Sequence, residues 1–270
     1  MNLPGLLADE PAPDRPAGAS GRPRGLVQMF DATSSTFTYL LFDRPGGQAV
    51  LIDPVDTMLG RDLEALLRLD VKLVHVLETH VHADHVTSAG ALREATGAGV
   101  VVPAHQQVAG ADREVEEGDD IRFGDAAPLQ VLATPGHTAG SVSYAWNGCV
   151  FTGDALFIDG CGRTDFQGGD AGVLHDSVTR KLFMLDGPTL VYPAHDYHGR
   201  SVSTIGYERR HNARFAGRSR DEFIALMGSL GLPMPKLIDV AVPANLRLGL
   251  PARPQAAPLR PGNGAGVPDR

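Results

Sequence analysis

One short segment of the chain concentrates side chains that bind metals. Three imidazoles and one carboxylate fall within six residues, at His80, His82, Asp84 and His85. Imidazole nitrogen and carboxylate oxygen suit zinc, iron or manganese, and a loop at a strand end lets alternate side chains converge on one point. A solvated loop would gain nothing from setting four polar groups against the end of an apolar strand. The segment therefore predicts a metal site.

Three further candidate ligands lie downstream, and each follows an apolar run: His137, Asp154 and His195. One such residue alone is more often structural. Together they indicate a chain that returns repeatedly to the same edge of a sheet. Asp53, after Leu51 and Ile52, also ends an apolar run. It is predicted either to orient a metal ligand or loop without binding the metal itself or to begin a turn before Pro54, and both interpretations stay open.

Composition narrows the classes of partner. The chain of 270 residues is 43% hydrophobic, enough to bury a full core, and carries a net charge of −8 with a pI near 5.6. This balance argues against a nucleic-acid or anionic-membrane partner, since both require clustered cations. No apolar run approaches the ~20 residues of a membrane span, and two cysteines fit a reducing compartment. We expect a cytoplasmic protein that acts on small molecules.

The hydropathy pattern predicts a mixed α/β body over residues 25–250. Residues 1–24 and the Pro-rich tail 251–270 lack periodicity and are predicted to be disordered extensions. No internal repeat is visible, although two similar halves could have diverged beyond recognition. Strands are expected at Thr36–Phe42, Ala49–Ile52 and Leu73–Leu77, and helices at Arg61–Leu69, Val173–Leu185 and Asp221–Leu230, the last capped by Ser219. In the first helix, Leu63, Leu66 and Leu67 are expected on the buried face.

Several strings together resemble the metallo-β-lactamase superfamily, and within it the persulfide dioxygenases. The resemblance runs from about Met29 to Leu248 and implies a four-layer αββα sandwich with the metal at one edge. Residues 160–167, Gly-Cys-Gly-Arg-Thr-Asp-Phe-Gln, are the most discriminating string, because hydrolytic relatives share the His motif and not this segment. The other strings are Glu78-Thr-His-Val-His-Ala-Asp-His85, Pro135-Gly-His-Thr-Ala-Gly-Ser-Val-Ser-Tyr144, Phe151-Thr-Gly-Asp-Ala-Leu-Phe157 and Tyr192-Pro-Ala-His-Asp-Tyr197.

The resemblance implies one Fe(II) per subunit, held by His80, His137 and Asp154. Such a two-histidine-one-carboxylate set leaves positions open for substrate and dioxygen. In binuclear relatives other residues complete a second metal site, and this chain has them all. The resemblance implies that this second site stays empty and that its residues support the first site from behind. They are His82, Asp84, His85 and His195.

The implied reaction oxidises glutathione persulfide with O2 and water to sulfite and glutathione. The two carboxylates of this substrate call for cations, and guanidinium groups match carboxylates bidentately. Arg163, Tyr197 and Arg214 match family positions associated with the substrate. Each also has a structural interpretation: Arg163 could cap carbonyls, Tyr197 could be core, and Arg214 could be one surface charge among several. Ala213 stands where the family commonly has Pro, so the turn at Arg214 could differ.

Two rival functions stay open at this point. The first is a hydrolase of the same fold, a glyoxalase II-type thioesterase that uses two metals to activate water. Its ligands would include Asp84, His85 and His195. The second is a non-enzymatic metal or persulfide sensor, which the full ligand set and the lack of a DNA-binding element disfavour. Coenzyme A persulfide could replace glutathione persulfide as substrate, and the resemblance suggests a homodimer.

Overall fold

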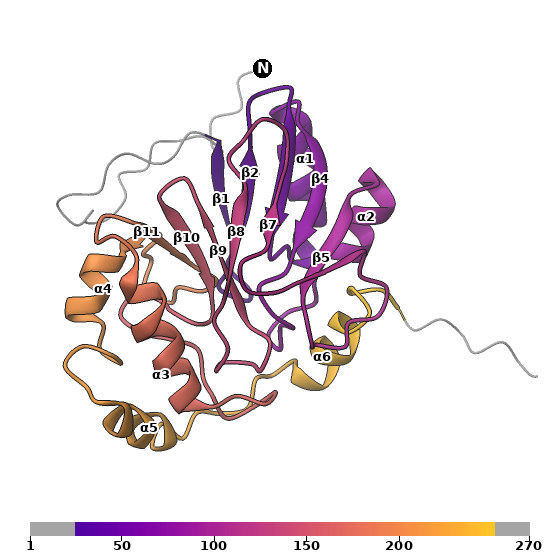
Figure 1. Ribbon diagram of the computed structural model, residues 1–270. Helices are drawn as coiled ribbons and strands as arrows, with labels where there is room; N and C mark the ends of the chain where they lie inside the picture. Colours follow the sequence, from indigo (N-terminus) through magenta and orange to yellow (C-terminus); the bar gives the residue numbers. More distant parts are fainter. Residues whose placement is uncertain (1–24, 252–270) are drawn as a thin grey trace, which may run out of the picture.

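Two six-stranded sheets lie face to face in the computed structural model (Figure 1). The structure describes residues 25–251, so the predicted extensions lie outside the described residues, apart from Pro251. The first sheet has the order β1-β2-β3-β4-β5-β6. Its first three strands pair antiparallel and the rest pair parallel. They are β1 (Leu26–Asp31), β2 (Thr36–Phe42), β3 (Gln48–Ile52), β4 (Lys72–Leu77), β5 (Gly99–Pro103) and β6 (Arg113–Val115).

The second sheet has the order β12-β11-β10-β9-β8-β7. Only the pair of β10 and β11 is parallel within it. Its strands are β7 (Asp120–Ile121), β8 (Leu129–Ala133), β9 (Val142–Trp146), β10 (Cys149–Gly153), β11 (Leu190–Pro193) and β12 (Ser203–Thr204).

Helices cover the outer face of each sheet (Figure 1). The first sheet carries α1 (Leu59–Arg68), α2 (Ala89–Thr96) and α6 (Ile238–Asn245), and the second carries α3 (Ala171–Arg180), α4 (Ile205–His211) and α5 (Arg220–Gly228). Short 3-10 turns, η1 (Asp56–Met58) and η2 (Leu182–Met184), precede α1 and follow α3. Because α6 comes last in the chain yet packs on the first sheet, the carboxyl-terminal segment crosses back over the molecule.

Alternation along the strands produces three apolar layers. In β2, Phe37, Tyr39 and Leu41 face the second sheet, whereas Leu40 faces the helices, as the period of two in a strand requires. In the second sheet, Tyr144 and Phe151 join the layer between the sheets. Val150 points outward against α3 and α5. The predicted four-layer αββα sandwich is thereby confirmed.

The two halves of the chain repeat one pattern. In the first half, β1, β2 and β3 form an antiparallel meander, and α1 leads to β4, which pairs parallel to β3. In the second half, β8, β9 and β10 form the meander, and α3 leads to β11, which pairs parallel to β10. The sequence shows no such repeat, so the similarity of the halves is retained only in the topology.

The expected strands and helices are confirmed with two corrections. Ser219 caps α5 in a capping box with Glu222. The expected helix over residues 173–185 instead ends at Arg180, because Lys181 leaves the helical conformation and its ammonium donates to Glu117 and to the Ala133 carbonyl, both at 2.7 Å. Leu67, expected on the buried face of α1, is 81% exposed. Within residues 25–251, no helix is long and apolar enough to cross a membrane.

Candidate metal centre

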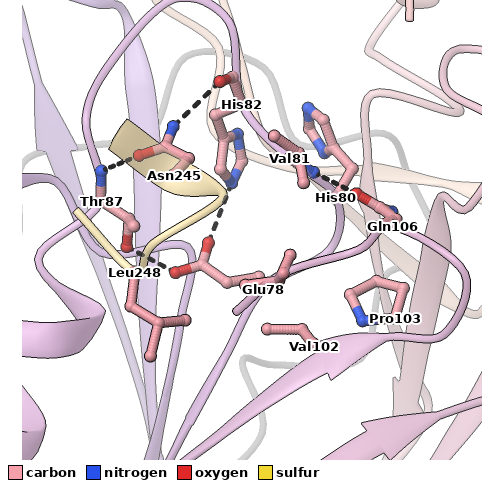
Figure 2. A pocket seen from close by; sticks show the side chains of 11 residues that line it. Glu78, His80, Val81, His82, Thr87, Val102, Pro103, Gln106, Asn245 and Leu248 are labelled. Atoms are coloured by element: carbon pink, nitrogen blue, oxygen red, sulfur yellow. Dashed lines mark hydrogen bonds and ion pairs between the residues drawn. The ribbon is translucent and has the colours of Figure 1, made fainter. Parts of the chain in front are cut away.

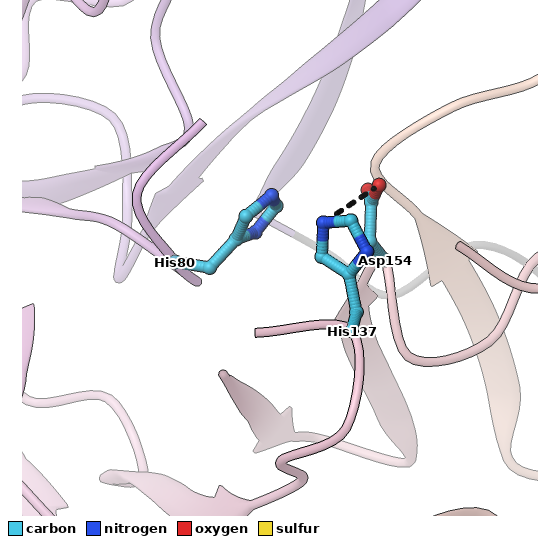
Figure 3. Close-up of side chains that lie close together, drawn as sticks. All are labelled: His80, His137 and Asp154. Atoms are coloured by element: carbon cyan, nitrogen blue, oxygen red, sulfur yellow. Dashed lines mark ion pairs between the residues drawn. The ribbon is translucent and has the colours of Figure 1, made fainter. Parts of the chain in front are cut away.

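Three loops that follow different strands bring His80, His137 and Asp154 together (Figure 3). The loops follow β4, β8 and β10. One ligand atom from each side chain lies within 4.8 Å of the others. His137 Nε2 is 3.4 Å from Asp154 Oδ2, and the rings of His80 and His137 stand perpendicular with centroids 4.9 Å apart. Two imidazoles and a carboxylate thus face one point from both sheets.

The Nδ1 atoms of His137 and His80 each have a hydrogen-bond partner already. His137 Nδ1 donates to the Arg163 carbonyl at 2.7 Å. The Thr79 hydroxyl donates to Asp53 Oδ2 at 2.7 Å, so it accepts from His80 Nδ1 at 2.9 Å. Both rings are thereby held in the tautomer that leaves Nε2 free as a ligand, the arrangement that metal-binding histidines usually show.

The electrostatics of this group also fit a metal cation. Burial lowers the pKa of His80 well below its usual value, and the neighbouring His82 and His137 lower it further, so the His80 imidazole is neutral and could bind a metal. Asp154 Oδ1 is buried and has no hydrogen-bond partner among residues 25–251. A buried carboxylate oxygen without a hydrogen bond is costly unless a cation lies close to it, and the ion-pair contact of this oxygen with His195 Nε2 is long, at 3.5 Å. The residues present therefore fit a divalent metal.

His82 is turned away from this point. Its Nε2 lies 3.2 Å from Asp53 Oδ1 and 3.2 Å from Glu78 Oε2, with all three side chains buried. Burial opposes the charged form, but the two carboxylates raise the pKa of His82 well above its usual value. His82 is thus a cation that neutralises two buried acids. Asp53 itself adopts a left-handed conformation with φ of 50° before Pro54, and it also accepts from the Thr79 amide at 2.7 Å.

Asp84, His85 and His195 form a second polar group beside the first. Asp84 Oδ2 lies 3.0 Å from His85 Nδ1 and 3.5 Å from His195 Nε2, and His195 Nε2 is also 3.5 Å from Asp154 Oδ1. Burial would raise the pKa of Asp84, but His195 and His85 hold it well below its usual range. The ligand atoms of His82, Asp84 and His85 also lie within 4.8 Å of one another. His85 Nε2 is buried without a hydrogen-bond partner in the described part of the chain.

The Arg163 guanidinium is occupied by the protein itself. Its Nε and Nη2 donate to the two Asp165 carboxylate oxygens at 2.6 and 2.8 Å, and its Nη1 donates to the Pro233 carbonyl at 2.6 Å. The Leu232 carbonyl accepts a further bond at 3.2 Å, and the ring of Phe166 lies 4.2 Å below the guanidinium carbon. Arg163 therefore joins the loop of residues 160–167 to the connector between α5 and α6.

The side chains of Tyr197 and Arg214 have fewer interactions with other residues than that of Arg163. The Tyr197 ring is 66% exposed and lies parallel to His195, with centroids 6.0 Å apart. The half-buried Arg214 uses its backbone amide to bond Asn212, but its guanidinium forms no hydrogen bond or ion pair with any other described residue. Of the two arginines predicted from the sequence, Arg214 is thus the one whose side chain is open to a ligand.

Comparison with known proteins places the chain in a family. The model of the metallo-beta-lactamase superfamily matches residues 33–195. The mitochondrial persulfide dioxygenase ETHE1 of Homo sapiens is 50% identical over 235 residues, which cover 86% of this chain and 92% of that protein. The chain belongs to the persulfide dioxygenase family. Its fold agrees with that of the crystal structure of ETHE1 from Myxococcus xanthus, at 55% identity and a TM-score of 0.81, covering 83% of this chain and 99% of that one.

A hydrolytic relative is more distant than these persulfide dioxygenases. The hydroxyacylglutathione hydrolase of Gloeobacter violaceus is 36% identical over 197 residues, covering 71% of each chain. The identities favour the dioxygenases over the hydrolases.

Three residues that support this candidate centre were assigned no role from the sequence. Thr79 and Glu78 directly precede His80, and a polar pair at the end of an apolar strand could have been recognised as support for the ligands. Asn245 donates to the carbonyls of His82 and His85 from α6. No local signal marks Asn245, because its partners lie far away in the sequence.

Proposed function

We propose that this protein oxidises glutathione persulfide with O2 and water to sulfite and glutathione at a single ferrous ion. The observation that carries the proposal is the three-residue set of His80, His137 and Asp154, in a chain that is 50% identical to a persulfide dioxygenase. Such a set leaves adjacent positions for two small ligands on one metal. His82 does not complete this set, because Asp53 and Glu78 hold its Nε2.

Bound at this set, ferrous iron would supply the electron transfer that lets dioxygen react with the terminal sulfur of the persulfide. The residues of the chain position the reactants. The Arg163 carbonyl and Thr79 fix the orientation of the two imidazoles. Asp84, His85 and His195 form the polar wall beside Asp154, where the paired charges of Asp84 and His195 balance each other. These residues are proposed to support the iron site without binding a second metal.

The proposed substrate site lies around Arg214 and Tyr197. Arg214 offers a guanidinium that no described carboxylate occupies, and a glutathione carboxylate matches it in charge and geometry. The exposed ring of Tyr197, stacked on His195, provides a flat wall beside the metal ligands. Direct binding of substrate by Arg163 would require the substrate carboxylate to replace Asp165, so its proposed contribution is to order the loop around the substrate.

The rival function is hydrolysis of a glutathione thioester at two metals. The buried Nε2 of His85 is the observation that favours it, because a second metal would give that atom a partner. Against it, Asp84, His85 and His195 already bond or face one another, and the hydrolase is the less similar relative. A homodimer and a reducing compartment complete the proposal; the free thiols of Cys149 and Cys161 support the latter.

The deciding experiment measures metal content and reaction in one sample. The protein is purified anaerobically, its metals are counted by elemental analysis, and oxygen uptake and sulfite are followed after glutathione persulfide is added. About one iron per chain with rapid uptake and sulfite formation is expected. Two metals per chain, no oxygen uptake and cleavage of a glutathione thioester would instead establish the hydrolase.

A further inference from the structure

Behind the His motif, four residues form a closed ring of polar contacts (Figure 2). The Asn245 side-chain oxygen accepts from the Thr87 amide at 2.9 Å, and the Thr87 hydroxyl donates to Glu78 Oε1 at 2.5 Å. Glu78 Oε2 pairs with His82 Nε2 at 3.2 Å, and the His82 carbonyl accepts from Asn245 Nδ2 at 2.9 Å. The ring thus closes on Asn245, and all four residues are buried.

Asn245 is the member of this ring that comes from outside the loop. Its Nδ2 makes a second bond to the His85 carbonyl at 2.8 Å, so one side chain satisfies three backbone groups of residues 82–87. A buried backbone group that loses its partner is costly. Asn245 bonds the backbone of His82, His85 and Thr87, so its side chain contributes directly to the conformation of the loop.

A short chain of contacts joins the ring to a metal ligand. His82 Nε2 also faces Asp53 Oδ1 at 3.2 Å, and Asp53 Oδ2 accepts from the Thr79 hydroxyl at 2.7 Å. That hydroxyl accepts from His80 Nδ1 at 2.9 Å. The path from Asn245 to His80 Nδ1 therefore consists entirely of contacts between buried polar groups.

The backbone after Asn245 packs against the same loop and against the first turn of α2. The Leu248 carbonyl accepts from the Gly90 amide at 2.9 Å, and Leu248 holds a left-handed φ of 60° while only 1% exposed. Gly249 follows with a φ of 73°, and a side chain there would overlap the Thr87 carbonyl oxygen. A non-glycine residue keeps such a conformation only where its surroundings impose it. The segment is therefore fitted to the loop and does not merely lie over it.

We propose that residues 245–249 act as a brace for the metal loop, with Asn245 as the positioning residue that sets the orientation of His80. The brace rests on the proposed metal set and is independent of which substrate is oxidised. Through this brace, the last helix of the fold positions His80, a proposed metal ligand from the first half of the chain. Removing the Asn245 amide releases the loop and lowers the affinity for iron while the rest of the fold persists.

The test compares Asn245→Ala and Asn245→Asp with Leu66→Ala. Asn245→Asp keeps the acceptor for Thr87 and loses the two donated bonds, so it is informative even if the alanine variant folds poorly. Leu66→Ala removes a buried side chain from α1, away from the metal, and serves as the control for general destabilisation. Ferrous affinity is measured by anaerobic titration, and the symmetry of the iron site by the electron paramagnetic resonance spectrum of its nitric oxide adduct.

Loss of a supporting contact behind a metal ligand typically costs about 10- to 100-fold in metal affinity. We expect a loss in this range and a changed spectrum in both Asn245 variants, with wild-type affinity and spectrum in Leu66→Ala. Wild-type affinity and spectrum in Asn245→Ala would overturn the brace, as would an equal loss of affinity in Leu66→Ala. If the wild-type protein itself bound no iron, the proposed function would fail instead.

Discussion

Gly162, in the string of residues 160–167, packs tightly against two proposed metal ligands, His137 and Asp154. A methyl group at this position would lie 2.6 Å from the Asp154 carbonyl oxygen, 2.8 Å from Asp154 Cβ and 2.8 Å from His137 Nδ1. Ordinary van der Waals contact begins at 3.4 Å, so the backbone of a Gly162→Ala variant must retreat by about 0.6–0.8 Å. The loop cannot move this far without disturbing its bonds to the ligands.

Two of those bonds determine the size of the expected loss in metal affinity. The Gly162 amide donates to the Asp154 carbonyl at 2.8 Å, and the next residue accepts from His137 Nδ1 at 2.7 Å. A retreat of this size would stretch both beyond good hydrogen-bond geometry. Since the loss of such a supporting contact typically costs about 10- to 100-fold in metal affinity, we expect Gly162→Ala to weaken ferrous binding by that factor. Anaerobic titration with Fe(II) measures it directly.

The same loop offers a matched control. A methyl group at Gly160 would meet Phe157 Cβ at 3.9 Å, which is ordinary contact, so Gly160→Ala should bind iron like the wild type. Both substitutions add one methyl group to a glycine of the same string. If Gly162→Ala and Gly160→Ala bound iron equally well, the close packing of this loop on the ligands would have no role in metal binding.

Three further predictions test separate parts of the structure. Asp154→Ala should lose iron while His195→Ala keeps near-normal content by elemental analysis; equal loss in both would contradict a single-metal site. Burial raises the pKa of Asp62 from 3.8 to about 6, so this carboxyl favours folding most below pH 3.8, and its contribution disappears as the pH rises through 6. Between acidic pH and pH 8, Asp62→Asn should therefore gain up to about 3 kcal/mol in free energy of unfolding relative to the wild type; parallel pH profiles in urea unfolding of the metal-free proteins would refute this. Arg214→Ala should raise KM for glutathione persulfide about 10- to 150-fold with little change in kcat, since hydrogen bonds to charged groups contribute about 1.5–3 kcal/mol and each 1.4 kcal/mol is tenfold. Arg210→Ala on α4 should not change KM.

The sequence predicted the elements that depend on local patterns. The strand at Thr36–Phe42 and the cap at Ser219 depend on neighbouring residues, and both appear as expected. The break after Arg180 could not be predicted, because Lys181 leaves the helix for acceptors near β8. Leu67 fits a helical stripe by spacing, but the buried face of α1 is centred on Leu66 and its neighbours on the other side.

The candidate site shows the same division between local and distant information. The spacing of the histidines indicated that they meet, but it could not show that His82 turns toward Asp53 and Glu78. That choice depends on side chains that become close only when β3 and β4 pair. Nor could the sequence distinguish an arginine held by Asp165 from one that is free, so both Arg163 and Arg214 were predicted to contact the substrate.

The repeated topology has a consequence for how the protein acquires its metal. Asp53 and Asp154 follow the third strand of their respective meanders, and the His motif and His195 follow the parallel strand after each crossover helix. His80 therefore belongs to one half and Asp154 to the other, so neither half contains the ligand set. A metal held by this proposed set can bind only after the halves have docked, and its binding energy then adds to the stability of the docked state. A bound metal would thus report complete assembly, and a protein with its halves apart would have two incomplete sets of ligands and no metal.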